Sequence, residues 1–309
     1  VAGGGVSSSR NRGSGGGGSA RVSNGGAGGG YVRPFSKGCV YSVKNNPLAG
    51  ISLSSWIRII YRYWWAIDFG RYWVRVLFVT VMACVNSLFW ALDWLFWRHA
   101  IQRAKVNPRP VFILGHPRTG TTLLHNLMSK DEQQFIFCST FQAGFPCGFG
   151  VLGRFQWLLS GVVDDQRPMD NMALSLDLPQ EDELAIKNLS NGSSQYMACH
   201  LIPQEKAHFR QLVSFEHATD KQQQEWHQAF TYLIKKLSAV NDGGTAKRRL
   251  LLKSPVHTGR VKLLLNMFPD AQFIYLHRNP YRVYLSMVNM LDKAYPYMYL
   301  NKPQDSQIQ

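Results

Sequence analysis

A glycine-rich segment has the residue types and spacing of a phosphate-binding loop. Gly115 and Gly120 follow the short apolar run Val111–Leu114 and precede a helix-like stretch. In such a loop, backbone N–H groups and a helix N-terminus surround the oxygens of an anion. Thr121 stands where a nucleotide triphosphatase carries lysine, and Arg118 supplies a cation inside the loop instead. Further donors are the hydroxyls of Thr119, Thr121 and Thr122. The segment predicts anion binding, and a tight strand-to-helix turn is the alternative.

An arginine and a serine eight residues apart form a second candidate anion site. Arg278 ends an expected strand, and Ser286 falls about two turns into the helix expected after Pro280. A guanidinium fork and a hydroxyl at this spacing could hold one phosphate together. A surface arginine and an unrelated helix serine are the alternative interpretation.

Together these segments resemble the sulfotransferase family that uses 3′-phosphoadenosine 5′-phosphosulfate (PAPS). The first is similar to the family's 5′-phosphosulfate loop, and Phe268–Ser286 is similar to its 3′-phosphate motif. Lys253-Ser-Pro matches a lysine of carbohydrate and tyrosyl-protein sulfotransferases, while residues 167–183 resemble the broad bacterial and algal branch. The resemblance extends over residues 106–300.

The resemblance implies an enzyme that moves a sulfuryl group from PAPS to a hydroxyl or amine and leaves 3′,5′-diphosphoadenosine. The residues implied to hold the 5′-phosphosulfate are Arg118, Thr119, Gly120, Thr121 and Thr122, and those implied for the 3′-phosphate are Arg278 and Ser286. Sulfuryl transfer resembles phosphoryl transfer in its loose, in-line transition state, so positioning and positive charge carry most of the catalysis. No metal is required.

Lys253 is the expected cation for the leaving phosphate, with a salt bridge at a strand end as the alternative. The general base must be a carboxylate or histidine near the acceptor hydroxyl. The candidates are Glu181, Asp182, Glu183, His200 and His257. Among the acids we favour Glu183 or Glu181, although the acidic run after Pro179 also suits an ordinary helix start. His257 could instead be a surface histidine at a helix end.

The apolar periodicity predicts an α/β fold, a P-loop-like three-layer domain with a central parallel sheet. Buried strands are expected at Val111–Leu114, Leu250–Leu252 and Phe273–Leu276. The expected helices are 121–128, 181–187, 222–237, 261–268 and 281–291.

Charge and composition divide the chain into three expected parts. Residues 1–50 form a Gly/Ser-rich tail expected to be disordered, residues 51–105 a basic, aromatic and apolar helical segment, and residues 106–309 a sulfotransferase domain expected to be truncated at its C-terminal end. The net charge is +15, and 14 basic against 2 acidic residues, or +12, fall before residue 111. Because the remainder is nearly balanced, we expect no nucleic-acid partner. Five cysteines without a C-x-x-C pair exclude a zinc knuckle.

Val76–Leu92 contains 17 residues without a charge, about 26 Å of helix and just short of a ~30 Å hydrocarbon core. The arginines before it would place the N-terminus in the cytosol and the domain in the Golgi or secretory lumen. A helix lying on the membrane, or one packed in a soluble cytoplasmic domain, is the alternative. The acceptor could be a glycan, a lipid, a peptide or a small molecule.

Two other functions compete with sulfuryl transfer. A P-loop kinase or nucleotide triphosphatase would need a lysine at position 121 and a magnesium-binding acid after a strand, and neither is present. A catalytically silent, membrane-tethered nucleotide-binding protein would bind PAPS without turnover.

Overall fold

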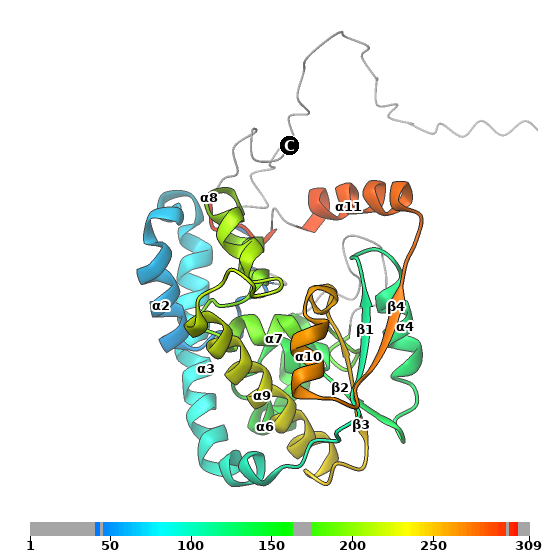
Figure 1. The fold of residues 1–309 in the computed structure, drawn as a ribbon. Coiled ribbons are helices and arrows are strands. Elements are labelled where there is room, and N and C mark those ends of the chain that lie inside the picture. The colour runs from blue at the N-terminus through cyan, green and yellow to red at the C-terminus, as the bar shows by residue number, and fades with distance from the viewer. Residues whose placement is uncertain (1–40, 44–45, 163–174, 295–296, 302–309) are drawn as a thin grey trace, which may run out of the picture. The chain divides into compact units, whose positions relative to one another are not determined.

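Four short strands form one parallel sheet in the order β2-β3-β1-β4 (Figure 1). They are β1 (Val111–Gly115), β2 (Phe135–Phe137), β3 (Arg249–Lys253) and β4 (Gln272–Leu276). The computed structural model describes residues 41–43, 46–162, 175–294 and 297–301, which belong to one compact unit. Because the strands are parallel, β1, β3 and β4 end at the same edge of the sheet, at Gly115, Lys253 and Leu276.

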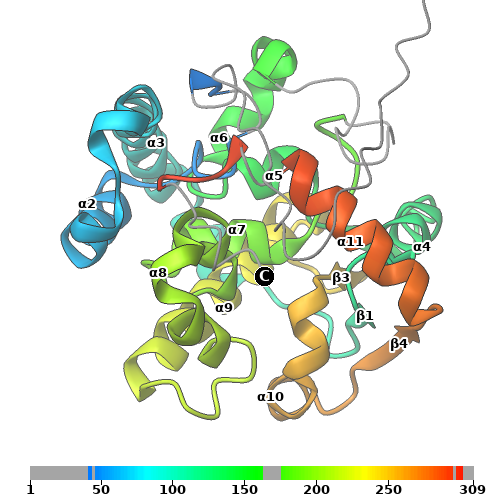
Figure 2. The ribbon, with the colours of Figure 1, turned by 90° about the horizontal axis from the view of Figure 1, so that it is seen from above.

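Side chains alternate between two apolar layers, one on each face of the sheet. Val111, Ile113 and Leu251 pack with side chains of α4 (Thr121–Met128). Phe112, Leu252 and their neighbours face the larger core, which contains α7 (Asp182–Leu189) and α9 (Asp220–Asp242). Figure 2 shows the sheet between these groups of helices. The predicted three-layer α/β fold is confirmed.

The remaining helices complete the layers and connect the strands. They are α5 (Thr140–Gly144), α6 (Phe149–Leu152), α8 (Ala198–Gln211), α10 (Val261–Met267) and α11 (Pro280–Ala294), with 3₁₀ turns η2 (Gly153–Val162), η3 (Gln195–Met197) and η4 (Pro255–Gly259). The expected strands and helices are all present, within a few residues of the predicted bounds. The sequence did not predict β2, α5, α6 or α8. The expected tail falls largely on residues outside the described ones, but Leu48 is fully buried in the core.

The basic, aromatic segment folds into two helices that pack on the sheet domain. They are α2 (Leu53–Tyr63) and α3 (Phe69–Arg103), joined by the 3₁₀ turn η1 (Trp64–Ala66). Ser52 and Asp68 cap them by accepting hydrogen bonds from the backbone N–H groups of Ser55 and Arg71. Among the described residues, α3 is the one helix long and apolar enough to cross a membrane. One of its faces is nevertheless buried against the rest of the unit.

A buried lysine joins α7 to α8 and to the chain before α2. The Lys187 ammonium donates hydrogen bonds to the Pro47 carbonyl at 2.9 Å and to His200 Nε2 at 3.1 Å. His200 Nδ1 lies 2.7 Å from the Met298 carbonyl, and burial holds the pKa of His200 well below its usual value. Burial also lowers the pKa of Lys187 to about 7. Since His200 is neutral, its Nδ1 donates to Met298 and its Nε2 accepts from Lys187.

The lowered pKa of Lys187 predicts that stability rises with pH. Folded Lys187 loses its proton near pH 7, whereas in the unfolded chain it holds the proton to about pH 10. Between these values the unfolded state binds more protons, so Lys187 adds a slope of at most about 1.4 kcal/mol per pH unit. Urea unfolding across this range should show a smaller slope for Lys187→Met than for wild type. The exposed lysine variant Lys262→Met is the control. Equal slopes for Lys187→Met and wild type would contradict the prediction.

Candidate active site

The loop between β1 and α4 depends on three residues with positive φ. Gly115 has φ 146°, and a Cβ there would lie 2.6 Å from the Leu276 carbonyl oxygen, so only glycine allows β1 and β4 to approach. Arg118 and Gly120 lie in left-handed conformations, at φ 72° and 101°. These left-handed residues turn the chain so that α4 can begin at Thr121. The result is a strand, a tight turn and a helix N-terminus at the carboxyl edge of the sheet, the arrangement of a phosphate loop.

The two candidate anion motifs meet at Arg118. Its Nε donates a hydrogen bond to Ser286 Oγ on α11 at 2.9 Å. Arg278, between β4 and α11, donates from Nη1 to the Arg118 carbonyl oxygen at 3.4 Å. The sequence predicted that Arg278 and Ser286 could hold one phosphate together, and in the structure both residues contact the loop residue Arg118. Two motifs about 160 residues apart therefore form one site.

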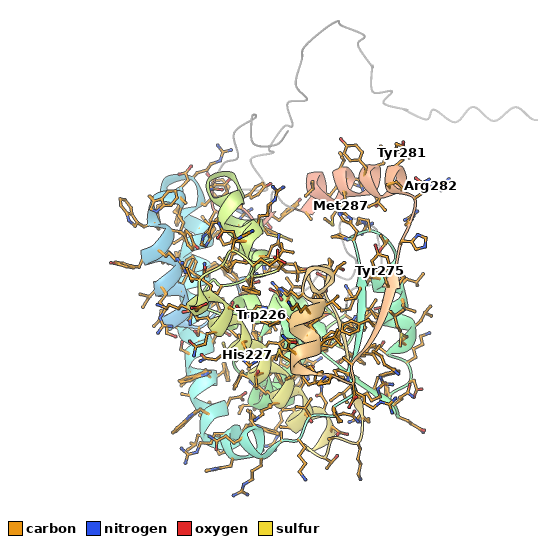
Figure 3. The ribbon with its side chains drawn as sticks, viewed as in Figure 1. Trp226, His227, Tyr275, Tyr281, Arg282 and Met287 are labelled. Carbon is orange, nitrogen blue, oxygen red and sulfur yellow. The ribbon has the colours of Figure 1, made fainter. Side chains whose placement is uncertain are left out.

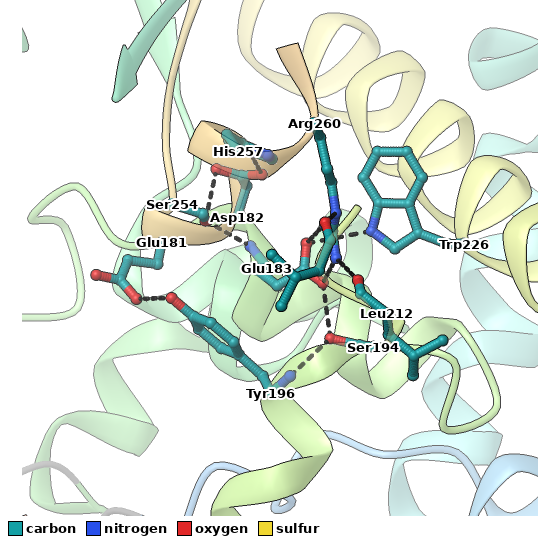
Figure 4. Close-up of polar contacts among 11 residues, drawn as sticks. Glu181, Asp182, Glu183, Ser194, Tyr196, Leu212, Trp226, Ser254, His257 and Arg260 are labelled. Atoms are coloured by element: carbon teal, nitrogen blue, oxygen red, sulfur yellow. Dashed lines mark hydrogen bonds and ion pairs between the residues drawn. The ribbon is translucent and has the colours of Figure 1, made fainter. Parts of the chain in front are cut away.

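Three consecutive acids at the start of α7 take three different partners (Figure 4). Glu181, 20% exposed at its side chain, contacts Lys253 Nζ through Oε1 at 2.7 Å. Its Oε2 accepts a hydrogen bond of 2.5 Å from the Tyr196 hydroxyl. Burial, followed by the charge of Glu181, holds the pKa of Tyr196 well above its usual value, so the phenol remains a donor.

Lys253 connects this carboxylate to the loop. It is the last residue of β3, its side chain is only 2% exposed, and its Nζ lies 3.3 Å from Thr122 Oγ1 on the first turn of α4. Thr119 lies in the same loop, where its hydroxyl donates to the His116 carbonyl, and Thr121 is buried at the helix start. A cation, a carboxylate and a hydroxyl thus lie together beside the phosphate loop.

The second acid, Asp182, is buried and binds the chain that follows Lys253. Its carboxylate accepts a hydrogen bond from Ser254 Oγ at 3.1 Å and contacts His257 Nε2 at 2.7 Å. Burial alone would raise the pKa of Asp182, but the charge and hydrogen bond of His257, with the bond from Ser254, hold it below its usual value. The Asp182 contacts fix α7 against β3 and η4, and so hold Glu181 beside Lys253.

Glu183, one of the two acids favoured from sequence, is fully buried in the core. Its carboxylate binds Arg260 through two contacts of 2.7 and 3.2 Å, and it also accepts from Ser194 and Trp226. The Arg260 guanidinium stacks over the Trp226 and Phe215 rings. Arg260, Ser194 and Trp226 thus hold the Glu183 carboxylate inside the core.

His257 and His200 also differ from their sequence interpretation. His257 is completely buried, so its interpretation as a surface histidine at a helix end is wrong. Its ring lies edge-on to Phe112 and Phe230. His200 is equally buried beside Lys187. Sequence reasoning missed Tyr196, because no local motif marks it and only the tertiary fold brings it to Glu181.

Comparison with known proteins identifies the family. Residues 110–308 match the sequence pattern described as the Sulfotransferase family, which is more than half of the chain. The chain belongs to the sulfotransferase family. That membership confirms the resemblance inferred from the loop and the Arg278–Ser286 motif, and it favours sulfuryl transfer over the kinase and nucleotide triphosphatase alternative.

Two curated relatives carry the name omega-hydroxy-beta-dihydromenaquinone-9 sulfotransferase Stf3, from Mycobacterium bovis and Mycobacterium tuberculosis. Each is 29% identical to this chain over 258 residues, or 82% of its length. The chain spans 63% of the length of these relatives. The crystal structure of sulfotransferase STF1 from M. tuberculosis H37Rv has the same fold, with a TM-score of 0.52 and 17% identity over 78% of this chain and 64% of that one. These similar proteins are bacterial, so they give no support to the expected Golgi location.

Proposed function

We propose that this sulfotransferase transfers a sulfuryl group from PAPS to a hydroxyl or amine acceptor by in-line displacement. The observation that carries the proposal is the meeting of two anion-binding motifs at Arg118. A donor with a phosphosulfate at one end and a separate 3′-phosphate needs two such groups side by side. A Cβ built on Gly120 meets no atom within 4 Å, so the start of α4 has open space for an anion.

The residues proposed to bind the donor follow the family motifs. Those for the 5′-phosphosulfate are Arg118, Thr119, Gly120, Thr121 and Thr122, and those for the 3′-phosphate are Arg278 and Ser286. When bound, PAPS supplies the sulfuryl group. The backbone N–H groups at the start of α4 and the Arg118 guanidinium would hold its negative charge in place.

We assign the general base to Glu181 and the leaving-group cation to Lys253. As the acceptor oxygen bonds to sulfur and the bond from sulfur to the bridging oxygen breaks, Glu181 takes the acceptor proton. Lys253 stabilises the negative charge left on the bridging oxygen. Each oxygen of the Glu181 carboxylate has two lone pairs, so it can accept from the substrate while bound to Lys253 or Tyr196. Glu183 and His257 are not assigned to the chemistry, because Arg260 and Asp182 hold them in the core and no contact joins either to the phosphate loop or to Lys253 among the hydrogen bonds and ion pairs of the described residues.

For the acceptor we propose a lipophilic alcohol held in a membrane. The curated relatives are named for a hydroxylated menaquinone, which is the only support the comparisons give to an acceptor class. The long apolar helix α3 supports membrane association. A glycan, a peptide or a small soluble alcohol would be the acceptor if lipophilic alcohols fail in the assay below.

Removing Arg278 should weaken donor binding. A charge-assisted hydrogen bond contributes about 1.5–3 kcal/mol, so Arg278→Ala should bind 3′,5′-diphosphoadenosine about 10- to 100-fold less tightly. Thermal unfolding with and without this nucleotide measures the change, since a ligand of the folded state raises the unfolding temperature. Arg282→Ala is the matched control, because Arg282 is an exposed arginine four residues further along the chain, near the start of α11 (Figure 3). Its binding should equal that of wild type.

Two further measurements separate the proposed function from its alternatives. Stabilisation by ATP–Mg²⁺ in place of 3′,5′-diphosphoadenosine would contradict the donor assignment. Release of 3′,5′-diphosphoadenosine from PAPS, measured with a panel of lipophilic alcohols, tests turnover. Nucleotide binding without release across lipophilic, carbohydrate and phenolic acceptors would favour the catalytically silent protein.

A further inference from the structure

We propose that α2, η1 and α3 dock this protein flat on an anionic lipid surface without crossing it. One side of α3 presents an uncovered apolar row, here called the α3 stripe: Trp73, Leu77, Val81, Val85, Leu88 and Leu95. Lipid binding by this face deepens the membrane association proposed above, and it stands or falls independently of sulfuryl transfer.

The α3 stripe is continuous and carries no charge. Its members recur every three, four or seven residues, so they share one side of the helix over about 33 Å. Each is at least 41% exposed. The sole acid within α3, Asp93, is buried on the other side. An apolar surface of this extent marks an interaction site rather than an ordinary solvated face.

The opposite side of α3 is fixed to the domain by buried polar groups. Asp93 forms a 2.5 Å ion pair with Lys236 of α9, and both side chains are fully buried. Its carboxylate also accepts from the backbone N–H groups of Gly150 and Val151 at the start of α6.

Two more polar side chains anchor the same side of the helix. Arg75 donates to the Tyr299 carbonyl at 2.6 Å, and Asn86 donates to the Ala49 and Ile51 carbonyls. A spanning α3 would have to leave the domain and place Arg75, Asn86 and Asp93 in hydrocarbon, where such groups are costly. The helix therefore stays packed on the domain and can expose only its stripe to lipid.

The charge of the segment that carries this face favours lipid headgroups over a second copy of the chain. Arg58 and Arg62 are exposed one turn apart on α2, whereas Asp68 is the one exposed acid between residues 46 and 110. Two copies of this face would bring like charges together, but anionic headgroups complement them. Tryptophans lie at both ends, with Trp64 and Trp65 beside the start of α3 and Trp94 toward its end. Tryptophan is enriched at the boundary between hydrocarbon and headgroups.

The position of the α3 stripe is compatible with binding of the water-soluble sulfuryl donor PAPS at the phosphate loop. Figure 2 shows α2 and α3 on the opposite side of the unit from α4 and β4. The phosphate loop joins β1 to α4, so it would remain open to water while the α3 stripe lies on lipid.

Vesicle sedimentation tests the proposal with the full chain. We expect binding to phosphatidylcholine vesicles that contain phosphatidylglycerol, and about tenfold weaker binding to phosphatidylcholine alone or at high salt. Leu77→Glu should weaken binding at least about tenfold, because it places a carboxylate in the stripe. Leu127→Glu is the matched control: Leu127 is 56% exposed on α4, against 55% for Leu77. It should bind as wild type does. Circular dichroism on each variant confirms that it is folded.

Three results would overturn the proposal. One is the absence of vesicle binding by folded wild type, and another is equal loss of binding in both leucine variants. The third is membrane-bound protein that resists alkaline carbonate extraction, since this would mean that α3 spans the bilayer. A concentration-dependent dimer that Leu77→Glu dissociates, with no effect on vesicle binding, would assign the face to a second copy instead.

Discussion

Replacing Glu181 by glutamine should lower the turnover number by about 10²- to 10⁴-fold, the usual contribution of a general base. Glutamine has the same shape and still offers an oxygen to Lys253 Nζ, which lies 2.7 Å from the carboxylate in the wild-type protein. The affinity for 3′,5′-diphosphoadenosine should therefore change little. Steady-state rates with any active acceptor, beside the nucleotide-induced shift in unfolding temperature, measure the two effects separately.

The pH dependence distinguishes a base from a structural carboxylate. If Glu181 takes the proton, the wild-type rate falls as acid protonates it, and Glu181→Gln loses this acid limb. Tyr196→Phe tests the group that positions Glu181, because it removes only the hydroxyl that donates to Glu181 Oε2 at 2.5 Å. The ionised carboxylate then loses a donor, so the acid limb should move to higher pH. An unchanged rate in Glu181→Gln, with reduced stability, would assign the Glu181–Lys253 pair to structure alone.

The parts of the site defined by contiguous residues were predictable from sequence. Gly115 and Gly120 are recognisable because a sharp turn between a strand and a helix needs positive φ at fixed positions, whereas Arg118 was predicted as the cation of the loop and its positive φ was not. The eight-residue spacing places Ser286 about two turns into any helix that starts near Pro280, while Arg278 precedes that helix. Strand β2 was missed because it contains only three residues, too few for a periodic pattern.

The division of roles among the three acids could not be predicted. Successive residues on a helix point about 100° apart, so Glu181, Asp182 and Glu183 face different surroundings. Which of them reaches the loop depends on where the fold brings Lys253, Ser254 and Arg260, more than 70 residues away. Burial of His257 between Phe112 and Phe230 has the same origin, because two segments distant in sequence cover it.

Helix α3 carries a sequence signal that composition alone does not report. A run of 17 residues without a charge suggests a membrane span, yet the polar residues in and beside it share one side of the helix. Arg75, Asn86 and Asp93 are spaced by 11 and 7 residues, close to whole numbers of turns, and all three are buried. That periodicity in the sequence predicts a helix with one buried side. The partners of these three side chains could not be predicted, since Lys236 and the carbonyls of Ala49 and Tyr299 come from distant segments.

The neighbouring acid Glu183 should show the opposite behaviour to Glu181. Replacing Glu183 by glutamine leaves the Arg260 charge buried between Trp226 and Phe215 without its counterion. Breaking such a pair costs about 3–5 kcal/mol, so this variant should lose about that much free energy of unfolding. Urea or thermal unfolding measures the loss. Glu216→Gln, at an exposed acid, is the control and should remain within about 0.5 kcal/mol of wild type.

A double variant tests whether the Glu183 effect comes from the unpaired charge. Removing both partners, as in Glu183→Leu with Arg260→Met, removes both charges of this pair from the core and should recover part of the stability lost in Glu183→Gln. Any Glu183→Gln protein that remains folded should keep a turnover number near that of wild type, because the fully buried carboxylate is held by Arg260, Ser194 and Trp226. A stable but inactive Glu183→Gln would instead make Glu183 the base. The contrast between two acids that lie two residues apart at the start of α7 therefore decides which of them serves the reaction and which the fold.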